Sequence, residues 1–278
     1  MKHALKDMTV AEFRDRLAEE PVILLPLGSH EEQGPHAPMG DYLLAEAIAL
    51  RAAELSGAVA APCLPFGHAD FFRGFPGGIQ LRAPTFRAVL TDMIEAFLDH
   101  GLPRILILNG HSTNAPLIDE VARGLRRQRG VAVASVDLWR SIPDALWTQI
   151  YGADAARARG HGGDPVTSVS MYLRPDMMRP DLIRHARPAT AMGLPVAGVG
   201  GVRMDGLPVN LPLDAHEVNG DGMLGGDAAL ASAAAGQAIF NHLAGHCAAV
   251  ARHLSRCDPC QPMSGPISEP MPEQGGAP

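Results

Sequence analysis

Short runs of consecutive apolar residues alternate with stretches of helical periodicity along the first half of this 278-residue chain. The apolar runs occupy residues 21–29, 58–67, 104–109 and 131–139. Between them, apolar side chains recur at helical spacing over 41–57 and 83–101, which predicts amphipathic helices there. Strands that are apolar throughout are buried on both faces, and strands that alternate with helices pair in parallel. The pattern therefore predicts an α/β fold in which helices cover both faces of a mostly parallel sheet.

A single domain is expected over residues 1–256. Apolar residues make up 46% of the chain and charged residues 19%, which is enough apolar material for one sheet with helices packed on it. Residues 225–256 are predicted to form one long helix at the end of this domain. Residues 257–278 are rich in Pro, Gly and Ser, so they are predicted to form a disordered tail.

The charge and the cysteine content exclude several classes of protein. A formal net charge of -7 without clustered Lys and Arg argues against nucleic-acid binding, so a small-molecule partner is expected. Neither the charged N-terminal segment nor any later run has the length and apolarity of a signal peptide or a membrane span. The cysteines form no disulfide framework, and Cys257 and Cys260 are not spaced as in a familiar zinc finger. These features predict a cytoplasmic protein without a membrane partner.

Three loops rich in Gly, His and carboxylates are the candidates for chemistry. The first, SHEEQGPHAPMGD, occupies residues 29–41 and follows an apolar run directly. The second, NGHSTN, occupies 109–114 and also follows an apolar run, and the third, RGHGGDPVTS, occupies 159–168. Each loop alone is typical of an ordinary turn. Together they place imidazoles and carboxylates at the edge where parallel strands end, which predicts a site for a divalent metal such as Zn or Mn.

The same loops resemble the signatures of the creatininase family. PLGSHEEQGPHAPMGD is similar to G-S-x-E-Q-H-G-P-H-L-P-x-x-x-D, RILILNGHSTN resembles the NGHGGN block, and HGGDPVTS resembles H-A-G-E-x-E-T-S. The segment GDGMLGGDAALASAAAGQ is similar to the closing G-x-x-G-D-P-x-x-A block, and the resemblance covers residues 20–255. It implies a three-layer α/β/α sandwich, an amidohydrolase that cleaves amide C–N bonds with Zn or Mn, and a homo-oligomer, often a hexamer.

The resemblance also implies a metal site with three protein ligands, Glu31, Asp41 and His111. The dinuclear members hold a second metal with a histidine two positions after that Glu and an acidic residue two positions after the NGH histidine. In this chain these positions carry Gln33 and Thr113, which are poor ligands for Zn or Mn. One tightly bound divalent metal per subunit is therefore expected. His36 matches a family histidine outside the usual ligand list, and it is a candidate to enter the site in place of a missing ligand.

The block around His161 carries the family's general acid/base histidine, so the resemblance assigns proton transfer to His161. Asp164 stands at an acidic position of the same block, where it either orients His161 or approaches the metal. Three further residues are candidates for substrate binding: His68, Ser112 and Gln33. His30 and Glu32 have no ligand counterpart in the family. They are expected to face outward or to support the ligands from behind, because successive residues of a strand point in opposite directions.

The expected function is hydrolysis of an amide, cyclic amide or formamide C–N bond in a small molecule by a metal-activated water. Two alternatives stay open. The first is a non-catalytic, metal-binding member that acts as a binding subunit, although such a protein has no need of the acid/base residue His161. The second is a peptidase-like member that cleaves a short peptide.

Overall fold

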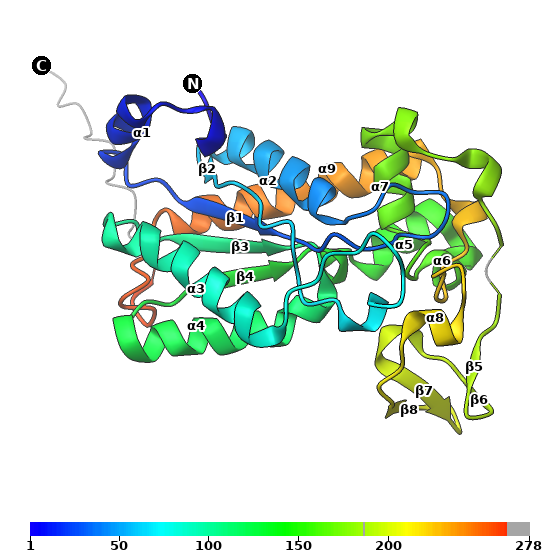
Figure 1. The fold of residues 1–278 in the computed structure, drawn as a ribbon. Coiled ribbons are helices and arrows are strands. Elements are labelled where there is room, and N and C mark those ends of the chain that lie inside the picture. Colours follow the sequence, from blue (N-terminus) through cyan, green and yellow to red (C-terminus); the bar gives the residue numbers. More distant parts are fainter. Residues whose placement is uncertain (186, 266–278) are drawn as a thin grey trace, which may run out of the picture.

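The fold is described by a computed structural model that covers residues 1–185 and 187–265, and within them the centre is a sheet of four parallel strands (Figure 1). The strands lie in the order β2-β1-β3-β4, and their bounds are β1 Ile23–Leu27, β2 Val59–Ala60, β3 Ile105–Asn109 and β4 Ala134–Asp137. β1 pairs with β3 over its whole length, from Ile23 opposite Ile105 to Leu27 opposite Asn109. The parallel sheet confirms the predicted α/β fold.

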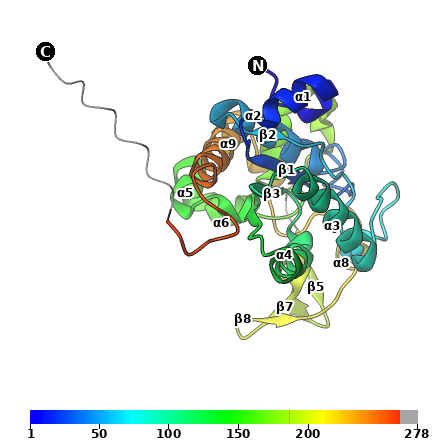
Figure 2. The same cartoon turned by 90° about the vertical axis from the view of Figure 1, so that its left-hand side faces the viewer.

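Helices cover both faces of the sheet and complete three layers (Figure 2). One face packs against α2 (Tyr42–Ser56) and α9 (Ala233–Leu254). The other face packs against α3 (Ala83–Asp99) and α4 (Ala115–Arg129), with α1 (Val10–Leu17) at the margin of the same layer. This arrangement confirms the predicted α/β/α sandwich.

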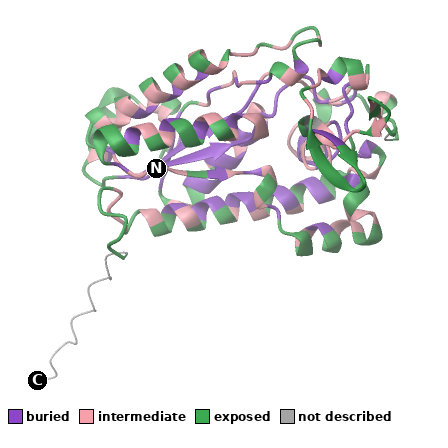
Figure 3. Ribbon diagram, turned by 90° about the horizontal axis from the view of Figure 1, so that it is seen from below, coloured by how far each residue is buried: buried purple, intermediate pink, exposed green. Residues whose placement is uncertain are grey.

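Alternate residues of the central strands point into opposite layers, which explains why these strands are apolar throughout. Leu24 and Leu106 belong to the apolar cluster under α2 and α9. Their neighbours Ile23 and Ile105 belong to the cluster under α3 and α4. Figure 3 shows the strands buried at the centre and the exposed residues on the outer sides of the helices. Both clusters hold the sheet rigidly, so its carboxyl edge is a stable platform for loops.

The second and fourth predicted strands are shorter than their apolar runs. The run at 58–67 forms a ladder only over Val59–Ala60, because Pro62 and Pro65 have no N–H to donate to a sheet. β4 covers only 4 residues of the run at 131–139. Both are edge strands of the sheet, so β1 and β3 form its fully paired centre.

The last helix also begins later than predicted. α9 starts at Ala233 and not at the start of 225–256, because the Ser232 hydroxyl accepts a hydrogen bond from the Ala235 N–H and caps the helix there. The preceding residues form a loop with a 3-10 turn at Ala228–Leu230. A glycine-rich loop therefore leads into the helix, and it lies near the third polar loop of the candidate site.

The predicted tail at 257–278 lies largely outside the described residues. Residues 257–265 are described and form turns close to the amino ends of β3 and β4. There the carbonyl oxygen of Cys257 accepts a hydrogen bond from the Arg104 side chain. The disorder predicted for 266–278 falls outside the described residues.

The chain between β4 and α9 gathers beyond the carboxyl ends of the strands (Figure 1). Its described elements are α5 (Asp144–Tyr151), α6 (Ala155–Ala158), α7 (Val166–Leu173), α8 (Ala215–Val218), β5 (Thr190–Ala191) with β6 (Leu194–Pro195), and β7 (Gly201–Met204) with β8 (Leu207–Asn210). α7 packs closely on α9, since a Cβ built on Gly236 would lie 1.9 Å from the Ser168 carbonyl oxygen. Among the described residues, none of the helices combines the length and the apolar character needed to cross a bilayer.

Candidate metal centre

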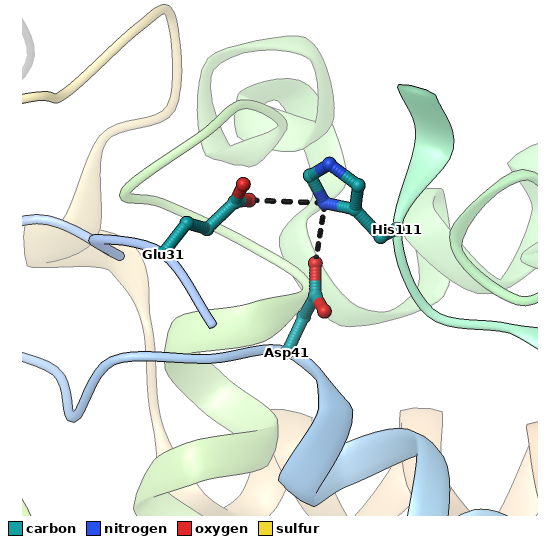
Figure 4. A group of neighbouring side chains, drawn as sticks. All are labelled: Glu31, Asp41 and His111. Atoms are coloured by element: carbon teal, nitrogen blue, oxygen red, sulfur yellow. Dashed lines mark hydrogen bonds and ion pairs between the residues drawn. The ribbon is translucent and has the colours of Figure 1, made fainter. Parts of the chain in front are cut away.

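Three side chains from separate segments meet at the carboxyl edge of the sheet (Figure 4). Glu31 follows β1, Asp41 stands just before α2, and His111 follows β3. One ligand atom from each lies within 4.8 Å of the other two. His111 Nδ1 is 3.1 Å from Glu31 Oε1 and 2.9 Å from Asp41 Oδ2. This is the one such group among the described residues, which include Cys257 and Cys260, and it consists of the three predicted ligands.

The position of Asp41 depends on a close backbone contact at Gly28. A Cβ built on Gly28 would lie 2.3 Å from Tyr42 Cα and 2.6 Å from Asp41 Oδ1, so any other residue there displaces the start of α2. Asp41 Oδ1 accepts a hydrogen bond from the Ser29 N–H at 2.7 Å. This bond holds one carboxylate oxygen and leaves the other, Oδ2, facing His111.

The electrostatics of this buried group fit a divalent metal. Glu31, Asp41 and His111 are each at most 3% exposed. Burial raises the pKa of Glu31, although His111 opposes this shift. Burial lowers the pKa of His111. The charges of Glu31 and Asp41 outweigh this effect and raise the pKa of His111 well above its ordinary value. Glu31 Oε2 is buried and has no hydrogen-bond partner among the described residues. Two buried carboxylates around one imidazole therefore leave an oxygen that a cation satisfies.

Thr113 contacts the nitrogen of His111 that faces away from the two carboxylates. The Thr113 hydroxyl donates to the His68 carbonyl oxygen at 2.5 Å, and it lies 2.6 Å from His111 Nε2. Because the single hydroxyl hydrogen goes to the carbonyl, the oxygen must accept from the Nε2–H of His111. Nδ1 is then the nitrogen turned toward Glu31 and Asp41. A metal-ligating imidazole commonly donates its other ring N–H in this way.

The Thr113→Val substitution is expected to weaken metal binding by roughly 10- to 100-fold, the usual effect of losing the hydrogen bond behind a metal-ligating imidazole. Valine has nearly the same shape as threonine, but it cannot accept from the Nε2–H of His111. Thr113→Ser keeps the hydroxyl and is the matched control. Competition with a chromophoric chelator measures the affinities. Equal affinity in the parent and the valine variant would show that Thr113 does not orient His111.

A cavity of about 670 Å³ lies beside the three ligands, within the usual range for small-molecule sites. The residues predicted for the site that line it are Glu31, Gln33, Asp41, His111, Ser112, His161 and Asp164. Trp139, Trp147 and Ile142 supply apolar walls. Neither tryptophan is among the residues predicted for the site, although Trp139 follows β4 at the same edge as the other loops. The three polar loops therefore share one cavity.

His161 meets a carboxylate that the sequence analysis did not assign to it. Its Nε2 lies 2.7 Å from Glu32 Oε1, and the ring stacks on Phe72 with the centroids 4.1 Å apart. Glu32 was expected to face outward or to support the ligands, but it is buried and turned toward His161. The strand alternation behind that expectation ends with β1 at Leu27, before Glu32 is reached. The sequence does contain one feature that could have indicated this role, which is a second carboxylate directly after Glu31.

The carboxylate of Asp164 is held by partners other than His161. It accepts hydrogen bonds from the Tyr151 hydroxyl, from the Ser168 hydroxyl at 2.6 Å and from the Ser168 N–H at 2.8 Å. Burial raises the pKa of Asp164 to about 6, although the bonds from Ser168 oppose the shift. Asp164 therefore lines the cavity while anchoring the start of α7, and Glu32 occupies the place beside His161. A catalytic role for Asp164 stays a prediction.

Two predicted histidines lie away from the ligand group. His36 is fully buried, its Nε2 lies 3.0 Å from Thr167 Oγ1, and burial lowers its pKa. In this structure Thr167 contacts the ring and His36 is not part of the three-residue ligand group, so entry of His36 into the metal site stays a prediction. His68 lines a neighbouring cavity, with its Nδ1 3.3 Å from the Leu81 carbonyl oxygen, so it does not contact the cavity beside the ligands.

Comparisons with known proteins, by sequence and by structure, indicate one family. The sequence model of the family described as "Creatininase: Creatinine amidohydrolase" matches residues 6–251. Creatinine amidohydrolase of Pseudomonas putida is 30% identical over 203 residues, which cover 66% of this chain and 76% of that protein. The mycofactocin precursor peptide peptidase of Mycolicibacterium smegmatis is 29% identical over 236 residues, which cover 82% of this chain and 83% of that protein. A solved structure, "Creatininase Mn", has a TM-score of 0.75 at 26% identity and covers 91% of this chain and 98% of its own.

Proposed function

This chain belongs to the creatininase family, and we propose that it is a metal-dependent amidohydrolase that cleaves an amide, cyclic amide or formamide C–N bond of a small molecule. One observation carries the proposal. The buried group of Glu31, Asp41 and His111 lines the same cavity as His161. A structural ion needs only its ligands, whereas a metal group and an imidazole beside an open cavity suit hydrolysis.

The proposed reaction divides its tasks between the metal group and His161. Glu31, Asp41 and His111 are the residues that hold the metal. When bound, Zn or Mn acts as a Lewis acid that lowers the pKa of water and stabilises negative charge on a carbonyl oxygen. His161 accepts a proton from the attacking water and returns it to the leaving nitrogen. Trp139 and the other apolar walls orient the substrate against these groups.

A second candidate function is cleavage of a short peptide. The mycobacterial peptidase overlaps a larger share of this chain than creatinine amidohydrolase does. The cavity of about 670 Å³ also has room for the end of a short peptide. Both candidates use the same ligands and His161, so they differ only in the substrate that the cavity accepts.

A substrate panel tests the proposed function. Protein loaded with Zn or Mn is incubated with N-formyl compounds, lactams, hydantoins and short peptides, and the released amine is measured. Turnover of a non-peptide class by the parent, with loss of turnover in His161→Ala, supports the proposal. Turnover of peptides alone favours the second candidate. If the metal-loaded protein turns over none of these compounds, the remaining alternative is a non-catalytic binding subunit.

One tightly bound metal per subunit is the stoichiometry that we propose. Gln33 Nε2 donates to Glu31 Oε1 at 3.3 Å, and the Thr113 hydroxyl is engaged with His111, so both residues contact ligands of the first metal. A neutral amide and a hydroxyl do not offset the repulsion between two adjacent dications. Elemental analysis after dialysis is expected to give about one metal per chain in the parent and more in Gln33→His. Two tightly held metals in the unmodified protein would contradict this expectation.

We also propose a cytoplasmic location and a homo-oligomer, of the hexameric kind that the resemblance to the family implies. The hairpin of β7 and β8 exposes apolar side chains, with Leu207 70% and Met204 55% exposed. Contact with a second copy of the chain is one way to cover them. Light scattering of the purified protein measures the number of subunits.

A further inference from the structure

We propose that Glu32 is a positioning residue that determines which nitrogen of His161 exchanges protons with the cavity. The inference rests on the proposed function, in which His161 transfers the proton. Glu32 Oε1 lies 2.7 Å from His161 Nε2, and Glu32 Oε2 accepts a hydrogen bond from the Gly34 N–H at 2.7 Å. Both carboxylate oxygens are therefore occupied, one by the imidazole and one by the backbone.

The backbone at Gly222 packs closely against the carboxylate of Glu32. A Cβ built on Gly222 would lie 2.1 Å from Glu32 Oε2, so the backbone at Gly222 passes directly over the carboxylate. Gly222 has a φ of 78°, which favours glycine at this close approach. His161 lines the cavity, whereas Glu32 is not among the described residues that line it. Glu32 therefore stands behind His161 and does not contact the substrate.

The ring of His161 is held on its face and through its backbone as well as at Nε2. Phe72 stacks on the ring at an interplanar angle of 28°. The His161 N–H donates to the Leu224 carbonyl oxygen at 3.1 Å, and the Leu224 N–H donates back to the His161 carbonyl oxygen at 2.8 Å. With its face, one edge and its backbone in contact, the imidazole presents a single orientation to the cavity.

The carboxylate selects the tautomer of this imidazole. An ionised carboxylate only accepts hydrogen bonds, so His161 Nε2 carries the hydrogen and Nδ1 keeps the lone pair. No hydrogen bond among the described residues engages Nδ1. In the proposed reaction Nδ1 takes the proton of the attacking water and later gives it to the leaving nitrogen, while Nε2 keeps its hydrogen bond to Glu32. The negative charge of Glu32 stabilises the imidazolium that exists between these two steps.

Burial and the neighbouring charges shift the pKa of His161 in opposite directions. Burial lowers the pKa of His161, and the neighbouring His111 lowers it further. The charges of Glu32 and Glu31 outweigh both effects and raise the pKa above its ordinary value, with Glu32 contributing more than Glu31. Removing the charge of Glu32 alone is therefore expected to make His161 a weaker base.

The test is the Glu32→Gln variant, with Glu54→Gln as the matched control. Glutamine has the shape of glutamate, and the family signature carries Gln at this position. It keeps one oxygen that accepts from the Nε2–H of His161, but it lacks the charge and the second oxygen that accepts from the Gly34 N–H. Glu54 is an exposed carboxylate on α2 that pairs with Arg51. For the best substrate of the panel, kcat is expected to fall roughly tenfold or more in Glu32→Gln, with KM and metal content unchanged. The control is expected to match the parent.

Nitrogen-15 NMR of histidine-labelled protein reads the tautomer without any substrate. His161→Ala identifies the signal of His161. In the parent, neutral His161 is expected to carry its hydrogen on Nε2, and in Glu32→Gln its proton affinity is expected to fall by roughly tenfold. A neutral tautomer with the hydrogen on Nδ1 in the parent would overturn the inference, and so would an unchanged proton affinity in the folded variant.

The two readouts separate this inference from the proposed function. A lowered proton affinity together with no turnover of any panel compound supports the pair of Glu32 and His161 and rejects hydrolysis. Turnover that is lost in His161→Ala but unchanged in Glu32→Gln supports hydrolysis and rejects the role of Glu32. Because the tautomer is measured in the unmodified protein, the inference stays refutable even if Glu32→Gln fails to fold.

Discussion

Alanine in place of Glu31, Asp41 or His111 is expected to remove the bound metal and, with it, measurable hydrolysis. In the proposed site each residue supplies one of three protein ligands, and loss of one ligand removes most of the affinity for a divalent metal. The remaining two ligands stay buried, so solvent does not readily replace the lost donor. Elemental analysis after dialysis measures the metal, and turnover of the best panel substrate measures the activity.

Asp144→Ala is the matched control for these three variants. Asp144 is a carboxylate in the wall of the same cavity, but its side chain is 88% exposed and pairs with Arg159 at 2.7 Å. This variant is expected to keep its metal. If any of the three ligand variants retains full metal and full turnover while folded, the metal site lies elsewhere in the chain.

The His161→Ala variant is expected to keep its metal and to hydrolyse substrate roughly 10²- to 10⁴-fold more slowly, the usual effect of losing a general acid/base. His161 is not part of the three-residue ligand group, and its Nε2 is engaged by Glu32. The metal therefore stays, while the group that moves the proton is lost. Steady-state kinetics and elemental analysis of the same preparation measure the two effects.

Removing the ring of His161 also leaves Glu32 buried without its partner, which can lower the stability of the fold. His161→Gln separates this effect from the loss of proton transfer, because its amide N–H donates to Glu32 but does not act as a base. The rate of hydrolysis is expected to fall by a similar factor in His161→Ala and in His161→Gln. Loss of metal in His161→Gln would identify His161 as a ligand and not as the acid/base residue.

This chain differs from the family signature at two adjacent positions, 32 and 33, and the proposals above explain both differences. Where the signature reads Gln-His, this chain reads Glu32-Gln33. The second position loses an imidazole suited to a second metal, and the first position gains a carboxylate that pairs with His161. In the proposed reaction, His161 and Glu32 therefore take a larger share of the proton transfer, and a second metal takes none.

Local sequence pattern was sufficient to predict the layers of the fold and the edge of the sheet at which the polar loops meet, whereas the resemblance to the family named the three candidate ligands. The apolar runs at 21–29 and 104–109 are satisfied only where both faces of a strand are covered, as in a parallel sheet between helices. In such a sheet the segments that follow neighbouring strands emerge at one edge. Glu31 and His111 both follow such a strand, so connectivity alone places them close together. The motif resemblance assigned them, together with Asp41, as candidate metal ligands.

The tertiary structure alone determined which side chains contact the polar residues around the three candidate ligands, because these contacts join segments far apart in the sequence. Glu32 pairs with a residue 129 positions away, and His36 is held by one 131 positions away. After Leu27 the chain leaves the strand, so no repeating backbone geometry sets the direction of its side chains. Alternation therefore left two positions open for Glu32, outward or behind the site, and only its contact with His161 selects the second. The motif likewise left open whether His36 reaches the metal. In an irregular loop, side-chain direction depends on individual backbone torsions and on whichever distant polar group satisfies the side chain, and a local pattern contains neither.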